Sequence, residues 1–285
     1  MKHSFAILFL LTACIAFSMD SPSAEGIINK NFGMNNEGLP YLGITYNADG
    51  TVMAVENGEL LFRHREGDTA SKLPSPLGSW LALDHGDGII SIYSRFETDS
   101  APIPENVDKG RHLGEAGISG WSKQKGFFFQ LFDRKERRWI NPFMIMPPPQ
   151  DIRPPVIVSV RLRDLSGNIF NPSETRTLNQ GRYFLIVDSV DTMRLPNENP
   201  LAPYKITCSL NGSEAGVLLF ETYSVRDGFL MVRRNGLVPV RQVFAPVPGY
   251  EVAELWLSRG QTTLEIEAQD IAGNVRNVIY RLMVE

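Results

Sequence analysis

Two runs of residues in the clearest segment of this chain each divide into two alternating sets. Trp80, Ala82 and Asp84 alternate with Leu81 and Leu83, and Ile90, Ile92 and Ser94 alternate with Ser91, Tyr93 and Arg95, with His85-Gly-Asp-Gly88 between the two runs. Period-two alternation interrupted by a short Gly/Asp turn is typical of a β-hairpin. Residues 78–96 are therefore predicted to form a hairpin around which the first part of the chain is organised.

Short strands and tight turns are predicted for the whole of residues 26–147. No segment there repeats its apolar residues with the 3.6-residue period of a helix over three turns. Besides the hairpin, the expected strands are Thr51–Val55, Gly58–Phe62, Lys109–Gly114, Phe127–Phe132 and Trp139–Met146. Polar, proline-bearing loops are expected at 63–76 and 97–108.

A proline-rich segment then divides the chain. Pro147–Pro155 holds five prolines in nine residues, which favours a stiff, extended conformation and excludes a strand interior. We predict a first domain at 26–147, a linker at 148–155 and a second domain at 156–285.

The second domain shows the same short-strand pattern. Val156, Val158, Val160 and Leu162 are expected on one face of its first strand. The further strands expected are Tyr183–Asp188, Tyr204–Leu210, Gly216–Tyr223, Phe229–Arg233, Ala253–Leu257, Thr263–Ala268 and Val275–Val284. Strands of this number and length predict an antiparallel β-sandwich. The segment Ala268–Asn274 resembles the last hairpin of many bacterial Ig-like domains.

The N-terminus predicts export. An apolar run, Phe5–Leu11, follows Met-Lys-His and is too short to span a bilayer. Leu11-Thr-Ala-Cys14 is similar to a lipoprotein signal, in which Cys14 would carry a lipid and attach the protein to a membrane. Ala16-Phe-Ser18 would instead suit an ordinary signal peptidase, and both alternatives stay open. Residues 1–25 are thus assigned to a signal and short linker, and the protein to the periplasm or cell envelope.

Composition narrows the function classes. Of the 285 residues, 43% are apolar and 21% charged, which is a globular composition. The formal charge of −4 gives no reason to expect nucleic acid as a partner. Once Cys14 is removed or lipidated, Cys208 has no intrachain partner, so it is expected to be a small buried apolar residue in its strand.

The first domain resembles the lysostaphin/LytM-type zinc endopeptidases, which have the duplicated hybrid motif fold and cut the peptide cross-links of peptidoglycan. The resemblance spans residues 32–147, and its motifs occur in the family's order. The segments that carry it are Asn31–Met34, Asp49–Gly58, Leu83–Gly88 with Ile92-Tyr93, Val107–Gly114 with Gly117–Gly120, and Trp139–Pro142. The resemblance implies an all-β, LytM-like first domain ahead of the Ig-like sandwich.

The residues that would hold zinc in that family are replaced. The family uses His-x-x-x-Asp and the second His of His-x-His, and here Tyr41, Thr45 and Phe128 stand at those positions. Arg95 and Gly126 stand where supporting histidines are implied. Phenylalanine has no lone pair, threonine is neutral and tyrosine titrates only near pH 10, so no zinc site is expected and no cofactor is assigned.

No other catalytic pattern stands in for the lost one. His64, His85 and His112 lie in a predicted loop, turn and surface strand, so each is expected to be a surface or turn residue and not a ligand of a relocated metal. The sequence has no Gly-x-Ser-x-Gly elbow, phosphate-binding loop or Cys-x-x-Cys. The sequence predicts a pseudo-metallopeptidase and not an enzyme.

Aromatic residues occupy the former cleft. Tyr41, Trp121 and Phe128, with Arg95, would form either a filled core or an open aromatic groove that binds a peptide or a protein. The hypothesis is a non-catalytic envelope protein that binds peptidoglycan or a cell-wall hydrolase and regulates wall remodelling. Two alternatives stay open: a zinc endopeptidase with unusual ligands, and a structural or adhesion module of the cell surface.

Overall fold

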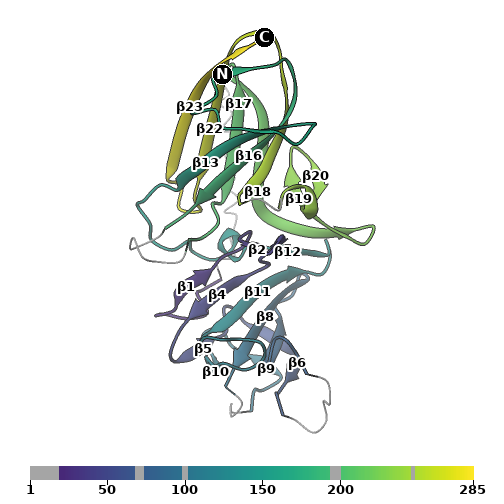
Figure 1. Ribbon diagram of the computed structural model, residues 1–285. Coiled ribbons are helices and arrows are strands. Elements are labelled where there is room, and N and C mark those ends of the chain that lie inside the picture. Colours follow the sequence, from purple (N-terminus) through teal and green to yellow (C-terminus); the bar gives the residue numbers. More distant parts are fainter. Residues whose placement is uncertain (1–18, 68–73, 98–101, 193–199, 245–247) are drawn as a thin grey trace, which may run out of the picture.

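The computed structural model describes residues 19–67, 74–97, 102–192, 200–244 and 248–285 (Figure 1). The regular elements in these residues are strands and two short 3-10 helices, so the predicted all-β class is confirmed. The proposed lipidation site, Cys14, lies outside the described residues. Among those residues, no helix has the length and apolar character needed to cross a membrane.

The first domain is one antiparallel sheet with smaller pieces beside it. Its strands are β1 (Ile27–Lys30), β2 (Asn35–Asn36), β3 (Leu39–Pro40), β4 (Ile44–Asn47), β5 (Thr51–Met53), β6 (Gly58–His64), β7 (Ser79–Asp84), β8 (Ile89–Phe96), β9 (Asn106–Val107), β10 (His112–Glu115), β11 (Phe127–Asp133) and β12 (Arg138–Ile140). The sheet runs β12-β11-β8-β7-β6-β9, and β4 pairs with both β1 and the N-terminal half of β11. Strands β5 and β10 form a separate ribbon.

The second domain packs two sheets face to face (Figure 1). Its strands are β13 (Val156–Asp164), β14 (Ile169–Phe170), β15 (Thr177–Leu178), β16 (Gly181–Val190), β17 (Lys205–Leu210), β18 (Ser213–Arg226), β19 (Phe229–Arg234), β20 (Leu237–Pro239), β21 (Tyr250–Leu257), β22 (Gly260–Gln269) and β23 (Val275–Val284). One sheet has the order β14-β13-β16-β21, and the other runs β15-β23-β22-β17-β18. The 3-10 helix η2 (Val240–Gln242) follows β20.

Two hydrophobic cores lie on either side of the proline segment, but the domains are not separate bodies. Strand β12 of the first domain pairs with β18 of the second, through Trp139 opposite Tyr223, so one sheet continues through both. Phe32 belongs to the core of the second domain and lies 5.0 Å, ring centroid to centroid, from Tyr223. The Asn31 amide donates to the carbonyl of Ala202 and accepts from its N–H, both at 2.8 Å. The linker therefore joins domains that are already fixed together.

The hairpin predicted at residues 78–96 is present as β7 and β8. Leu81 and Leu83 of β7 and Tyr93 of β8 are fully buried, whereas the turn residues Gly86 and Asp87 are exposed. The side chain of Asp84 accepts a hydrogen bond from the N–H of Gly86 at 2.9 Å, as expected of a residue that caps a turn.

Some local expectations were wrong. The strand expected at 139–146 ends at Ile140, because Pro142 cannot donate to a strand ladder and instead begins the 3-10 helix η1 (Pro142–Met144). His64 is the last residue of β6, not part of a loop. Val160 and Leu162 are buried, but Val156 and Val158 are 46% and 57% exposed, because a bulge at 157–159 leaves Val158 unpaired with β16.

Cys208 lies in β17 with no exposed surface. Burial raises the pKa of its thiol to about 12, so it stays protonated near neutral pH. A protonated, inaccessible thiol is a poor nucleophile, and Cys208 packs as the small apolar residue that the sequence predicts.

Candidate functional site

Two of the three residues that the resemblance places at zinc positions, Thr45 and Phe128, are direct neighbours in the first sheet. Phe128 of β11 lies opposite Thr45 of β4 on one side and opposite Ser94 of β8 on the other. Thr45 is 4% exposed and Phe128 is 9% exposed. Positions that are far apart in sequence are thus neighbours across three strands, where directly opposed Cβ atoms lie about 5 Å apart.

Tyr41 completes the group from the loop before β4. Its hydroxyl oxygen is 2.8 Å from the hydroxyl oxygen of Thr45, within hydrogen-bond distance. The Tyr41 ring meets the edge of the Phe128 ring with centroids 5.2 Å apart, in the T-shaped arrangement that aromatic pairs favour. The two hydroxyls are therefore hydrogen-bond partners of each other, and the phenyl ring of Phe128 has no donor atom for an ion.

Arg95 enters the same site from a bulge in β8. Ser79 pairs with Phe96 and Trp80 with Ser94, so Arg95 is an extra residue without a partner on β7. Its φ is 72°, a left-handed conformation that costs a residue with a side chain about 1 kcal/mol or more. One guanidinium nitrogen donates to the Tyr41 hydroxyl at 3.2 Å, and the guanidinium carbon lies 5.5 Å from the centre of the Phe128 ring. The bulge aims a permanent cation at the place where the family resemblance implies a metal.

Gly126 occupies a backbone position that excludes a side chain. A Cβ built there would lie 2.0 Å from the carbonyl oxygen of Tyr46 in β4, far inside contact distance. The residue also forms a β-bridge with Gly117, through two backbone hydrogen bonds of 3.0 Å. A histidine at position 126 would require β4 and β11 to separate.

The donor chemistry at this site does not fit zinc. Zinc takes imidazole nitrogen, thiolate sulfur or carboxylate oxygen, and the group offers two mutually bonded hydroxyls, a phenyl ring and a guanidinium. Within the described ranges, the one cluster of three metal-ligating side chains is Asp151, Asp191 and Asp270, none of which lines this site.

An open hollow of about 520 Å³ lies over Tyr41 and Thr45. Its lining residues are Asn29, Lys30, Met34, Tyr41, Thr45, Asn47, Arg95, Trp121, Ser122, Lys123, Gln124 and Pro200. Three of them are cationic and none is a carboxylate, and the ammonium of Lys30 lies 5.1 Å from the centre of the Tyr41 ring. Trp121 stands at the site with 78% of its surface exposed.

This hollow matches neither of the two alternatives left open by the sequence, a filled core or an open aromatic groove. Tyr41, Arg95 and Trp121 line it, but Phe128 lies buried and fills the space below. The lining is polar and positively charged, because Lys30 and Lys123 lie in it beside Arg95. These two lysines come from segments that no sequence motif singled out. Phe128 fills the floor of the cleft while its upper part stays open.

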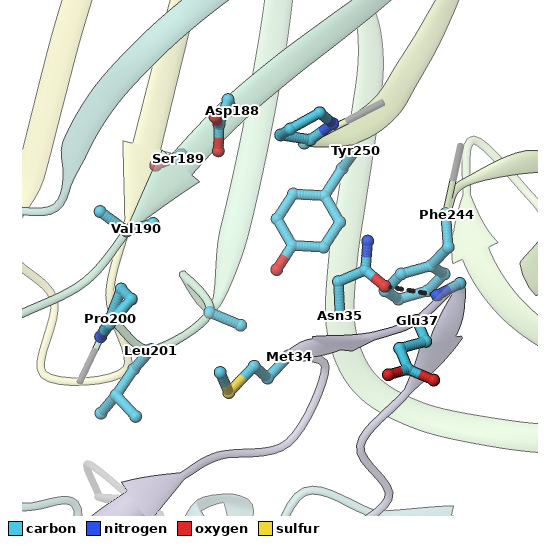
Figure 2. Close-up of a pocket in the computed structure, with 14 residues that line it drawn as sticks. Met34, Asn35, Glu37, Asp188, Ser189, Val190, Pro200, Leu201, Phe244 and Tyr250 are labelled. Carbon is cyan, nitrogen blue, oxygen red and sulfur yellow. Dashed lines mark hydrogen bonds between the residues drawn. The ribbon is translucent and has the colours of Figure 1, made fainter. Parts of the chain in front are cut away.

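A second hollow, of about 730 Å³, lies between the domains (Figure 2). Met34 and Pro200 line both hollows, so the two adjoin. Figure 2 shows Tyr250 and Met34 on its sides, and the buried Tyr250 hydroxyl donates to the carbonyl of Gly33 at 3.4 Å. Burial raises the pKa of Tyr250, so it remains a neutral donor. The charged side chains that line this second hollow are Glu37 and Asp188, which are opposite in sign to those lining the hollow over Tyr41.

Among the described residues, the histidines His64, His85 and His112 lie apart from the hollow over Tyr41, as none of them lines it. His85 is in the hairpin turn, where its two ring nitrogens lie 2.7 Å from the carbonyl oxygen of Asn57 and 2.7 Å from the hydroxyl of Ser91. Burial lowers its pKa despite the hydrogen bond to Asn57 and the nearby acids. His112 is half-exposed beside Glu115 at 3.0 Å.

Comparison with known proteins gives only slight similarities. A protein-family model without a functional description matches residues 154–285, which is less than half of the chain. No curated protein matches the sequence.

Among solved structures, a mutant catalytic domain of the prophage-encoded M23 protein EnpA from Enterococcus faecalis is 20% identical over 45% of this chain and 95% of its own, with a TM-score of 0.36. The catalytic domain of lysostaphin from Staphylococcus simulans is 18% identical over 38% and 79%, with a TM-score of 0.30. A SpoIIQ–SpoIIIAH pore-forming complex matches at 17% over 46% and 92%, with a TM-score of 0.37. Similarities this slight say nothing about activity, so function has to be argued from the residues.

Proposed function

We propose that the protein is a non-catalytic, LytM-type protein of the cell envelope that binds peptidoglycan or a cell-wall hydrolase and regulates wall remodelling. The supporting observation is the group Tyr41, Thr45, Phe128 and Arg95, which lie in mutual contact at the positions where the resemblance implies zinc and its supporting histidine. The cleft is kept, while its metal donors are exchanged for groups that bind one another. The proposal includes export, with Cys14 as a lipid attachment site.

The charge of the cleft indicates the ligand chemistry. Lys30, Arg95 and Lys123 line the hollow without a carboxylate among the described residues there, so it attracts an anionic group. A guanidinium is well suited to a carboxylate, because it can donate two parallel hydrogen bonds to it. Peptidoglycan peptides carry free carboxylates, and an acidic loop of a hydrolase carries them too. The exposed Trp121 ring would cover the apolar part of such a ligand.

Binding to insoluble peptidoglycan tests the proposal. Trp121→Ala should weaken co-sedimentation about 10-fold or more, since a tryptophan at the centre of an interface is worth about 2 kcal/mol. Lys123→Ala should also weaken it, because it removes one of the three cations that line the hollow. Trp256→Ala and Lys135→Ala are matched controls. Trp256 is 60% exposed in the second domain, and Lys135 lies in the turn between β11 and β12, beside Asp87, and does not line the hollow. Both controls should bind as the wild type does.

The same variants separate the two ligands. If peptidoglycan binding is absent in the wild type, affinity capture from envelope extract should recover a wall hydrolase with wild type and controls, and not with Trp121→Ala. If neither cleft variant changes any binding, the cleft is not the binding site and the alternative of a structural or adhesion module is favoured.

The enzyme alternative has its own test. A zinc endopeptidase with unusual ligands would purify with one zinc ion per chain and would release muropeptides in a chelator-sensitive manner. We expect neither, because a metal at this site would lie beside the Arg95 guanidinium and a phenyl ring. Stoichiometric zinc in the folded wild-type protein would overturn the proposed function.

A further inference from the structure

Three carboxylates meet beside the linker, away from the cleft. Asp151 belongs to the proline segment, Asp191 follows β16, and Asp270 follows β22. One carboxylate oxygen of each lies within 4.8 Å of the others. The cluster thus joins the linker to both sheets of the second domain.

Two of these carboxylates are buried and the third, that of Asp151, is half-buried, and they have no compensating charge. Asp191 is 3% exposed and Asp270 is 1% exposed. Among the described residues, no lysine, arginine or histidine forms an ion pair with any of the three. Burying one unpaired carboxylate costs several kcal/mol, and three like charges together cost more. Such a cluster requires either protons or a cation.

Two oxygens in the cluster also have no hydrogen-bond donor. Asp191 Oδ1 and Asp151 Oδ2 are buried and have no partner in the described part of the chain. Burial first, and then the charges of Asp270 and Asp151, raise the pKa of Asp191 to about 7. An unpartnered oxygen on a residue that is almost wholly buried is an independent indication of a missing ligand.

The third carboxylate is held in place by the turn that follows it. Asp270 accepts from the N–H and from the side-chain amide of Asn274, both at 2.8 Å. The same amide donates to the backbone carbonyl of Asp151 at 3.1 Å, which brings the linker to the turn. The hydrogen bonds of Asn274 therefore hold Asp270 and the linker carbonyl in place, so this part of the site is preorganised.

We propose that Asp151, Asp191 and Asp270 bind one divalent cation, Ca²⁺ in preference to Mg²⁺ or Zn²⁺, which ties the linker to the second domain. Ca²⁺ binds oxygen ligands at about 2.3–2.6 Å, so two oxygens on one ion can be up to about 5 Å apart, as these are. The absence of nitrogen and sulfur donors in the cluster disfavours Zn²⁺. Mg²⁺ demands a near-ideal octahedron, which carboxylates from three separate segments supply less readily than the irregular shell of Ca²⁺.

The second domain contains a matched control. Asp164 and Asn168 form the same Asp-x-x-Gly-Asn turn, with the same two hydrogen bonds of 2.8 Å. Asp164 has no second and third carboxylate beside it, since it is not part of the described cluster. A substitution at Asp164 therefore removes a turn carboxylate without touching the proposed site.

The test is calorimetric titration of CaCl₂ and of MgCl₂ into the chelator-treated full chain, with thermal unfolding alongside. Wild type and Asp164→Asn should bind one Ca²⁺, and at 100-fold excess over Kd their melting temperature should rise by roughly 5–10 °C. Asp191→Asn should weaken Ca²⁺ binding at least 10-fold. Adding Ca²⁺ should slow amide hydrogen exchange at residues 150–153 in the wild type. It should not do so in Asp191→Asn at Ca²⁺ concentrations that this variant does not bind.

Asp191→Asn also separates a cation from a proton. In chelator, the variant should melt at or above the wild-type temperature, because the amide removes an unpaired buried charge. In saturating Ca²⁺ the order should reverse. The proposal is overturned if the folded wild type binds no Ca²⁺, if Asp191→Asn binds it equally well, if Mg²⁺ binds as tightly, or if the variant is more stable in both conditions.

Discussion

Restoring the zinc donors would test whether the degenerate positions converge on one metal site. The perturbation is the triple substitution Tyr41→His, Thr45→Asp and Phe128→His, made with Arg95 retained and again with Arg95→Ala. Gly126 stays glycine, because a Cβ there would collide with Tyr46. Thr45 and Phe128 are cross-strand neighbours, and Tyr41 already contacts both. We expect the variant with Arg95→Ala to bind one zinc ion per chain.

Arg95 should oppose that ion strongly. Its guanidinium nitrogen lies 3.2 Å from the Tyr41 hydroxyl, so an ion held by residues 41, 45 and 128 would be about 5 Å from a unit positive charge. At an effective dielectric constant of about 20, the repulsion of a divalent ion over that distance is about 7 kcal/mol. The side chain can swing towards solvent, and a third of this value, about 2 kcal/mol, still corresponds to about 30-fold in Kd.

Competition with a chromophoric chelator measures the zinc affinity, and circular dichroism establishes that each variant is folded. The triple alanine variant at positions 41, 45 and 128 is the control for adventitious zinc. If the folded variant with Arg95→Ala binds no more zinc than the alanine control, the three positions do not form a LytM-type site. If retaining Arg95 leaves the Kd unchanged, the electrostatic part of the reasoning is wrong.

Two further predictions concern stability. Burial lowers the pKa of His85, so the unfolded chain binds a proton at this residue more readily than the folded chain does. The free energy of unfolding should therefore have its largest contribution from His85 above about pH 6.5, and this contribution should be lost as the pH falls from there through the folded pKa. In urea unfolding from pH 8 to 5, the wild type should lose stability relative to His85→Gln as the pH falls, a comparison in which the opposite effect of the raised pKa of Asp191 is common to both proteins. A constant difference between the two profiles would refute the assignment. Gly126→Ala should destabilise the chain by about 3 kcal/mol or more, because Cβ would lie 2.0 Å from the Tyr46 carbonyl oxygen. Gly167→Ala, which has open space and φ of +88°, should cost only about 1 kcal/mol in the same urea titration, and equal costs would contradict the steric argument.

The strands were predictable wherever apolar alternation was local. The residues of the hairpin formed by β7 and β8 follow one another in the sequence, so the hairpin could be predicted from a local pattern. The strand expected at 139–146 failed because a single proline, Pro142, outweighs the apolar residues around it.

The site was only partly predictable for a different reason. Motif spacing singled out Tyr41, Thr45 and Phe128, because each stands at a defined place in a resembling segment. The left-handed conformation of Arg95 depends on how β7 and β8 are paired, and no local pattern encodes that bulge. The proposed cation ligands Asp151, Asp191 and Asp270 are each isolated in sequence, and only the tertiary fold brings them together.

The pairing of β12 with β18 has a consequence for how the molecule can be divided. Trp139 and Tyr223 lie opposite each other in paired strands. Dividing the chain at the prolines would leave each of them on an exposed edge strand with unpaired backbone groups. Edges of this kind recruit other chains and promote aggregation. Phe32 would also be pulled out of the far half, leaving a void against Tyr223. The stretch that looks most like a seam in the sequence is thus not a place where the folded protein comes apart.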